Sequence, residues 1–213
     1  ATTFVVILVW ALFVLVSGGV GPLVARATGR NDPEERVRII ATGLSLMALM
    51  YVVVGISVVA CASTIASMLG LSGEIATLTT TYLQVLYLTG FAMAIGPVID
   101  AALIGMGNTV LPLILQTVVL CINACLTYFF IFHMEWGVAG AALGTTIAQT
   151  FGVFVGLWFL VRMTGLGRVH FGFGPFVAKI TRIGAPLAMG TAMYALVYWA
   201  LLATSVSKMG PEV

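Results

Sequence analysis

Six long stretches of the sequence contain no Asp, Glu, Lys or Arg. A helix needs about 20 apolar residues to cross a bilayer, and runs such as VVILVWALFVLV are apolar on every side. A transmembrane barrel would instead alternate polar and apolar residues along each strand. The pattern therefore predicts an all-α integral membrane protein, a polytopic helical bundle with six spans near 4–25, 39–61, 78–99, 110–132, 137–161 and 183–206.

Two of these spans carry polar side chains at helical spacing, because steps of three and four residues return to the same face of a helix. The first stripe consists of Gln116, Leu120, Asn123 and Thr127, and the second of Thr145, Gln149, Gly152 and Gly156. An unpartnered amide in hydrocarbon is costly, so a polar stripe should face protein or water. We expect the two stripes to face each other or a shared cavity.

The turns between spans carry clear signals. Asp32 followed by Pro33 is typical of an N-cap and a first helical residue. Asn108 or Thr109 can cap the predicted helix at 110–132. Only the residues 133–136 separate the fourth and fifth spans. These two spans should therefore form an antiparallel hairpin with an external tip.

Composition and charge agree with a membrane protein. Hydrophobic residues make up 61% of the chain and charged residues 8%, against about a quarter charged in a soluble domain. The basic residues gather in two clusters, at 26–38 and 162–182, and four predicted spans separate them. By the positive-inside rule both loops are cytoplasmic, in a multi-pass protein of the cell inner (plasma) membrane. The net charge of +2 gives no indication of nucleic-acid binding.

The sequence offers no enzymatic site. Cys61, Cys121 and Cys125 lie within spans and lack the spacing of metal ligands. The sequence contains no nucleotide-binding loop of the G-x-x-x-x-G-K type and no pair of nucleophile and base, so enzymatic chemistry and ATP-driven transport within this chain are disfavoured. We therefore expect no catalytic residue and no cofactor other than a coupling ion.

Asp100 is the one carboxylate at the edge of the apolar part of the chain. It could accept a proton or a sodium ion, because a buried acid binds protons more readily than an exposed one. Asp100 directly follows the predicted third span, however, so the sequence favours an interfacial residue that is solvated or bonded to the backbone.

Five motifs along the chain resemble one family, the multidrug and toxic compound extrusion (MATE) transporters. Residues 27–32 (ATGRND) resemble the family's A-x-G-x-x-D turn, and residues 104–109 (IGMGNT) resemble its R-G-x-G-D-T turn, with Ile104 and Asn108 in place of Arg and Asp. Residues 123–132 (NACLTYFFIF) resemble N-x-x-L-D-Y-x-L-I-F. Residues 137–145 (GVAGAALGT) resemble G-V-x-G-A-A-x-A-T, and Gly184 with Pro186 resembles G-x-P.

The resemblance implies twelve helices in two pseudo-symmetric lobes. In that frame, residues 1–161 would be the N-terminal lobe without its first helix, 162–182 the cytoplasmic linker, and 183–213 the first helix of the C-terminal lobe. The first span enters from outside, so we expect an odd number of helices before it. The missing remainder of the same chain would then be a partner of this part.

The resemblance also implies secondary active multidrug efflux. A cation, Na⁺ or H⁺, would move inward while an amphipathic organic compound, often cationic, moves out by alternating access. The family's carboxylate on the fifth helix corresponds to Thr127, so a Na⁺ site would consist of Asn123, Thr127 and Thr145. Asp100, Gln116, Gln149 and Tyr128 complete the candidate cation and substrate residues, Tyr128 through cation–π contact.

Two alternatives stay open at this stage. A flippase for lipid-linked oligosaccharides resembles these exporters in fold, but it should present Arg or Lys to the pyrophosphate in its cavity, and the predicted spans contain neither. A non-transporting membrane scaffold protein is the other alternative. Thr127 in place of an acid is its best support.

Overall fold

The computed structural model describes residues 2–68, 73–166 and 174–206, and within these ranges the regular structure is entirely α-helical. The helices are α1 (Thr2–Gly29), α2 (Pro33–Met68), α3 (Gly73–Thr89), α4 (Phe91–Gly105), α5 (Val110–Phe132), α6 (Gly137–Thr164) and α7 (Val177–Val206). The prediction of an all-α membrane protein is thereby confirmed. The middle of the predicted linker at 162–182 lies outside the described residues.

Five helices are individually long and apolar enough to cross a membrane, and α3 and α4 meet the same criterion when they are taken together as one bent pair. The hydropathy pattern predicts one helix over 78–99, but the structure divides this region at Gly90, where α3 and α4 meet at 54°. The second half also continues beyond 99, to Gly105. The hydropathy pattern missed the break because both sides of Gly90 are equally apolar.

The break exposes backbone groups that a continuous helix would pair, and a neighbouring helix pairs one of them. The Tyr51 hydroxyl of α2 donates a buried hydrogen bond of 2.7 Å to the carbonyl of Tyr87, in the last turn of α3. At the start of α4, the Met93 N–H donates to the Gly90 carbonyl at 2.9 Å. Unpaired backbone groups are costly in a bilayer, so these bonds stabilise the bend.

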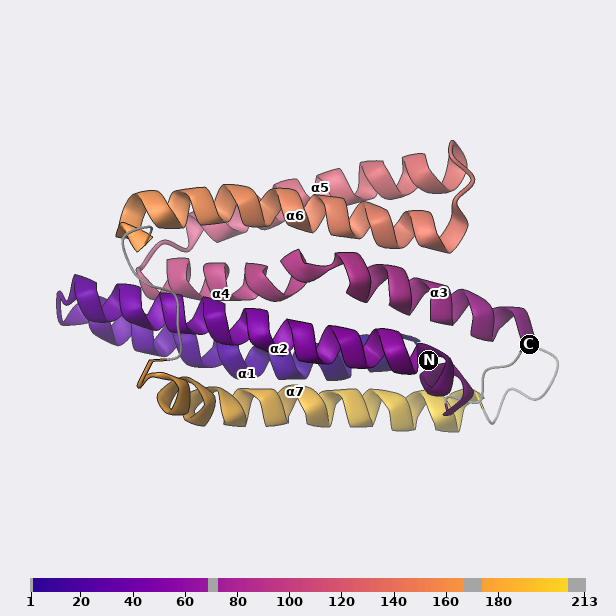
Figure 1. Cartoon of the computed structure of the whole chain (residues 1–213), viewed down its shortest axis with the longest axis horizontal. Coiled ribbons are helices and arrows are strands. Elements are labelled where there is room, and N and C mark those ends of the chain that lie inside the picture. Colours follow the sequence, from indigo (N-terminus) through magenta and orange to yellow (C-terminus); the bar gives the residue numbers. More distant parts are fainter. Residues whose placement is uncertain (1, 69–72, 167–173, 207–213) are drawn as a thin grey trace.

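The helices lie side by side along one direction, with the α5–α6 hairpin at one edge of the bundle and α7 at the opposite edge (Figure 1). Helix α1 packs against α7, α4 and α2, and α4 packs in turn against α6. The core between α1, α2 and α4 contains fully buried apolar side chains, including Val16, Val20, Met47, Val98 and Leu103. The position of α4 between α1 and α6 is what places its polar side chains inside the bundle.

Helices α1 and α7 approach each other at the level of their backbones. A Cβ atom added to Gly184 would overlap the Leu15 carbonyl group, and one added to Gly19 would overlap the Ile180 carbonyl group. Small residues of this kind let membrane helices pack closely. The interface contains no room for a larger side chain at either glycine.

The predicted turns and caps are confirmed. The Asp32 carboxylate accepts the Glu35 N–H at 2.9 Å and α2 begins at Pro33, while the Asn108 amide oxygen accepts the Leu111 N–H at 3.1 Å before α5. Residues 133–136 form the predicted hairpin tip between α5 and α6.

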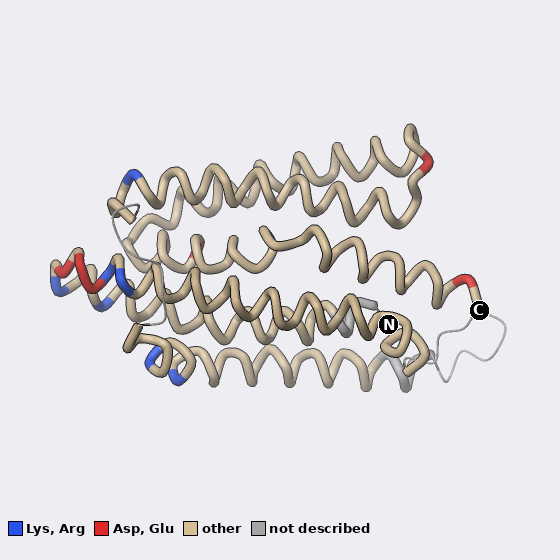
Figure 2. Tube along the Cα trace, in the orientation of Figure 1, with Lys and Arg blue, Asp and Glu red and all other residues tan. Residues whose placement is uncertain are grey.

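The charged side chains lie where the topology predicted. The described Lys and Arg residues gather at one end of the bundle (Figure 2). Both basic clusters therefore lie on the same side, as the even number of intervening spans required. One red position in Figure 2, in α4, lies away from the ends of the bundle.

Candidate functional site

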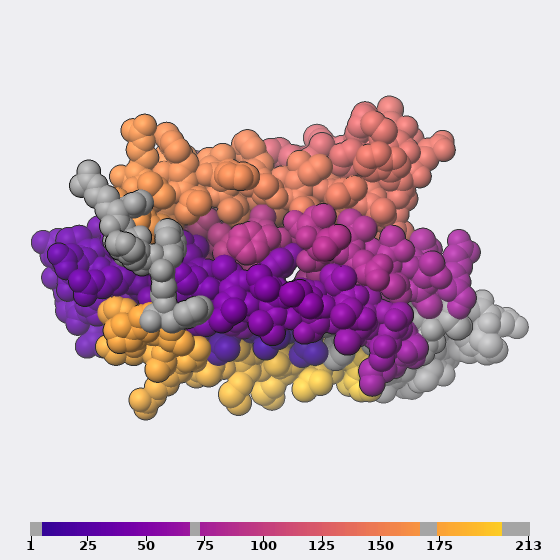
Figure 3. All heavy atoms as spheres, viewed as in Figure 1, coloured from indigo at the N-terminus to yellow at the C-terminus, as the bar shows by residue number. Residues whose placement is uncertain are grey.

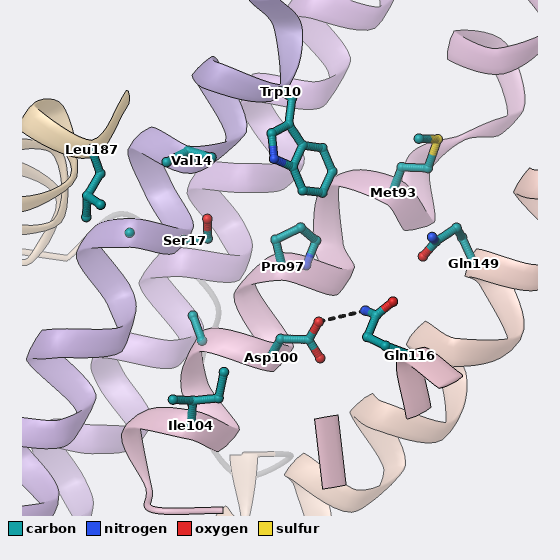
Figure 4. A pocket seen from close by; sticks show the side chains of 12 residues that line it. Trp10, Val14, Ser17, Met93, Pro97, Asp100, Ile104, Gln116, Gln149 and Leu187 are labelled. Carbon is teal, nitrogen blue, oxygen red and sulfur yellow. Dashed lines mark hydrogen bonds between the residues drawn. The ribbon is translucent and has the colours of Figure 1, made fainter. Parts of the chain in front are cut away.

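A cavity of about 470 Å³ lies between α1, α4, α5, α6 and α7. Most of its lining is apolar, and its polar side chains come from four different helices: Ser17 on α1, Asp100 on α4, Gln116 on α5 and Gln149 on α6. The Trp10 indole of α1 faces the same space (Figure 4). Cavities of about 300–1,000 Å³ with few, converging polar groups are typical of small-molecule sites.

Asp100 is bonded to a side chain across the helix interface. Its Oδ2 atom accepts a hydrogen bond of 2.8 Å from the Gln116 amide Nε2 (Figure 4). The expectation that Asp100 lies at the end of its span is wrong, because α4 continues to Gly105. Five further residues at about 1.5 Å each place Asp100 about 7 Å inside the end of α4.

The position of Asp100 differs from that of the other described acidic residues. Among the described Asp and Glu residues, it is the one that lies away from helix ends and connecting loops (Figure 2). A charge inside a membrane span is costly and is generally found facing protein or a polar cavity. Asp100 satisfies this condition through the Gln116 amide and the cavity.

The polar stripes of α5 and α6 meet, as predicted, in the hairpin. The Asn123 amide Nδ2 donates a hydrogen bond of 3.0 Å to the Thr145 hydroxyl, and this hydroxyl donates to the Ala141 carbonyl at 3.0 Å. Leu120 takes no part in this contact, since 68% of its surface is exposed, and Gln116 of the same stripe is also exposed. Part of the predicted stripe thus lies on the surface of the described bundle.

Thr127 lies on the same interface with an unsatisfied hydroxyl. A Cβ atom added to Gly144 of α6 would be 2.8 Å from the Thr127 Oγ1, which shows how closely the two helices approach there. The Thr127 Oγ1 is buried and has no hydrogen-bond partner in the described structure. An unsatisfied buried hydroxyl costs about 1–3 kcal/mol, so this oxygen is available to a further ligand.

The candidate residues thus fall into two groups. The first, Asp100 with Gln116 and Gln149, lines the cavity. The second, Asn123 with Thr127 and Thr145, lies within the α5–α6 hairpin. The structure brings each group together.

Tyr128 belongs to neither group. Its ring packs against Phe132 and His133 near the hairpin tip and 60% of its surface is exposed. It is not among the residues that line the cavity. Its predicted contact with substrate remains a prediction.

Sequence reasoning missed two features near the site. Trp10 lines the cavity, but a single aromatic residue in an apolar run carries no sequence signal of its own. The hydroxyls of Thr89 and Thr146 lie 3.1 Å apart and connect the end of α3 to α6. Thr89 and Thr146 are 57 residues apart in the sequence, so no periodic pattern predicts their contact.

No group of three or more His, Cys, Asp or Glu residues that could hold a metal ion occurs in the described part of the chain. The oxygen atoms of Asn123, Thr127 and Thr145 are a different kind of donor set. Hydroxyl and amide oxygens suit hard cations such as Na⁺ rather than transition metals.

Comparisons with solved structures find the same arrangement of helices in membrane transporters. The chain is 21% identical to a MATE-family multidrug resistance transporter of the MOP superfamily in its outward-facing conformation, with a TM-score of 0.86 over 96% of this chain and 47% of that one. The inward-facing conformation of such a transporter gives a TM-score of 0.81 at 21% identity, over 91% of this chain and 45% of that one.

A third structure is a MOP-superfamily transporter from Pyrococcus furiosus, in work that describes a reverse polarity of its binding pocket. It is 21% identical, with a TM-score of 0.80 over 92% of this chain and 44% of that one. The chain therefore spans about half the length of the solved structures it matches. These likenesses show a shared fold.

The family itself is shown by the sequence. No curated protein sequence matches the chain. The family model described as MatE matches residues 1–129, which is more than half of the 213 residues. The match includes the whole of α1 to α4, with Asp100, and most of α5. The chain belongs to the MatE family, as the motifs of its turns and its fourth predicted span indicated.

Proposed function

We propose that this chain forms one lobe of a secondary transporter, which exports amphipathic organic cations in exchange for Na⁺ or H⁺ moving inward. The observation that carries the proposal is the Asp100 carboxylate, which faces a cavity of about 470 Å³ inside the bundle. Its partner Gln116 is uncharged, and the described residues that line the cavity include no Lys or Arg.

The lining of the cavity supports a cationic and partly apolar substrate. Asp100 would provide the counter-charge, while the Trp10 ring would provide an apolar face that also attracts cations. Gln116 and Gln149 would donate and accept hydrogen bonds at the polar edge of the substrate. A carrier of pyrophosphate-linked saccharides would need Arg or Lys here, and the residues that line this cavity include neither.

Exchange at one carboxylate would couple the two fluxes. In a proton-driven exchanger, a proton and a cationic substrate would compete for the same negative charge, so binding of one favours release of the other. One inward charge is driven by about 2.3 kcal/mol per 100 mV, and a tenfold gradient contributes about 1.4 kcal/mol more. Together these support accumulation ratios of several hundredfold for a neutral substrate; the voltage term cancels for a monovalent cation exchanged one for one.

The hairpin group is the proposed Na⁺ site. Asn123 uses its amide nitrogen toward Thr145, so its amide oxygen remains as a ligand beside the unpaired hydroxyl of Thr127. This set carries no formal charge, whereas tight sites for hard cations generally include carboxylates. A Na⁺-driven transporter would use this group, and a proton-driven one would use Asp100 alone.

The test is efflux of a fluorescent organic cation by the full-length protein in sealed vesicles, with Na⁺ and proton gradients imposed separately. We expect flux with one gradient and its loss in Asp100→Asn, which keeps the shape but removes the charge. Glu74→Gln, at the exposed start of α3, is the matched control and should transport normally. Normal flux in Asp100→Asn, or no flux with either gradient in correctly folded protein, would refute the proposal.

A further inference from the structure

Helix α4 also forms the floor of a second, more apolar groove. It has a volume of about 620 Å³ and lies between α2 and α6 at the α3–α4 junction. Its lining residues are Leu44, Ser45, Ala48, Thr89, Phe91, Ala92, Ile95, Thr150, Val153, Phe154 and Leu157. In Figure 3, atoms of α4 are visible between α2 and α6 on the face shown.

This groove is open at the surface of the described bundle. It is formed by two membrane-spanning helices and the bent pair, and Phe91 and Phe154 at its rim are 45% and 70% exposed. Its three polar lining residues, Ser45, Thr89 and Thr150, are small. The hydroxyls of the two threonines donate to carbonyls of their own helices. The groove therefore presents an apolar surface, as an acyl chain requires.

A second hollow continues the same seam toward the charged end of the bundle. It has a volume of about 350 Å³ and is lined by Pro33, Glu34, Val37, Arg38, Thr164 and Gly165. Helices α2 and α6 are antiparallel. This hollow is lined by Arg38 and Thr164 and the groove by Ser45 and Leu157, so the two are separated by seven residues on each helix. Seven residues correspond to about 10 Å along the helix.

The spacing of the two hollows matches the depth profile of a lipid. The polar zone on each side of a bilayer is about 5–7 Å thick. With a headgroup at Arg38, Ser45 at about 10 Å along the helix would therefore lie below this zone, at a depth that an acyl chain occupies. The rim carries one acid and one base. The Glu34 carboxylate and the Arg38 guanidinium lie 3.4 Å apart, with 82% and 65% of their side chains exposed.

We propose that the α2–α6 seam binds a phospholipid with a zwitterionic, primary-amine headgroup of the phosphatidylethanolamine type. The phosphate faces Arg38, the ammonium faces Glu34, and one acyl chain lies in the apolar groove. A phosphate forms strong charge-assisted hydrogen bonds with a guanidinium, and a primary ammonium donates three hydrogen bonds to a carboxylate. The paired charges of the rim match this headgroup better than a purely anionic one.

The test uses the full-length protein in nanodiscs with equal amounts of phosphatidylethanolamine, phosphatidylcholine and phosphatidylglycerol. Native mass spectrometry after transfer to detergent then counts the retained lipids. We expect one phosphatidylethanolamine to be retained in preference to the other two. Equal retention of the three lipids, or a preference for the anionic phosphatidylglycerol, would overturn the proposal.

Variants separate the headgroup from the chain. Arg38→Gln should lower retention about fivefold, as for loss of one exposed ionic contact, and Glu34→Gln should remove the discrimination between the ethanolamine and choline lipids while binding persists. Ala48→Phe should fill the groove and abolish retention.

Arg38→Gln and Ala48→Phe each have a control that lies outside the seam. Arg162→Gln removes a base at the same end of the bundle, and Leu49→Phe enlarges the next, 47% exposed residue of α2. Both should retain the lipid normally. Loss in the controls, or retention in Ala48→Phe, would contradict the assignment. None of these measurements depends on transport activity.

Discussion

Helices α1 and α7 meet at their backbones, whereas α4 and α5 face each other across a cavity and are bridged by the Asp100–Gln116 hydrogen bond. The first interface depends on the absence of side-chain atoms at Gly19 and Gly184. The second depends on the presence of two polar groups that satisfy each other. Close packing makes an interface specific but intolerant of added volume, and polar bridging makes it sensitive to the loss of a partner.

The largest effect is expected at the closely packed interface. Gly184→Ala places a methyl group where the Leu15 carbonyl lies, so the backbones must move apart. We expect the variant to lose at least about 1–3 kcal/mol of stability, measured as thermal unfolding of the purified protein in detergent.

Gly190 provides the matched control on the same helix. A Cβ atom added there would meet nothing within 4 Å. Gly190→Ala should therefore be neutral or raise stability by up to about 1 kcal/mol, since Ala is the better helix former. Equal melting temperatures for the two variants would contradict the backbone contact between α1 and α7.

An intermediate effect is expected where α4 and α5 are bridged. Gln116→Leu removes the donor to the Asp100 carboxylate without creating a void, and the loss of a partner costs about 1–3 kcal/mol when the remaining group is buried. Asp100 is only partly buried, so we expect the lower end of this range.

The control is the same replacement on an exposed face. Gln84→Leu in α3 changes an exposed amide to a leucine and should leave the melting temperature unchanged or raise it. A comparison of the two variants by thermal unfolding isolates the bond to Asp100. If Gln116→Leu is as stable as the unaltered protein, the hydrogen bond contributes nothing to joining the helices.

The smallest effect is expected within the hairpin. A double-mutant cycle with Asn123→Leu and Thr145→Val should give a coupling energy of about 0.6 kcal/mol, the average for hydrogen bonds between membrane helices. Pairing Asn123→Leu with Thr191→Val, on α7, should give no coupling. A cycle value indistinguishable from this control would mean that packing alone holds α5 against α6.

The same contrast explains what the sequence could predict. The hairpin followed from its own residues, since the apolar spans stop at Phe132 and resume at Gly137 and both helix boundaries agree with the structure. The facing stripes followed from helical periodicity, and the bond between Asn123 and Thr145 confirms them. Each of these features depends on neighbours in the sequence.

The features that were missed depend on residues far apart in the chain. Periodicity shows which residues share a face, but it does not show that α4 packs between α1 and α6. The depth of Asp100 and the presence of Trp10 in the cavity follow from that packing. The break at Gly90 was also missed, since hydropathy does not register the donor that Tyr51 supplies from α2.

The bond between Tyr51 and the Tyr87 carbonyl makes the bend a joint property of two spans. The segment from α3 to α4 would not keep the same angle in another protein, because one group that stabilises the bend, the Tyr51 hydroxyl, lies 36 residues before Tyr87 in the chain. Sequence comparison restricted to the bent segment would therefore underestimate what maintains it. Because the acceptor is a backbone carbonyl, this hydrogen bond requires the hydroxyl at residue 51 but no particular side chain at residue 87.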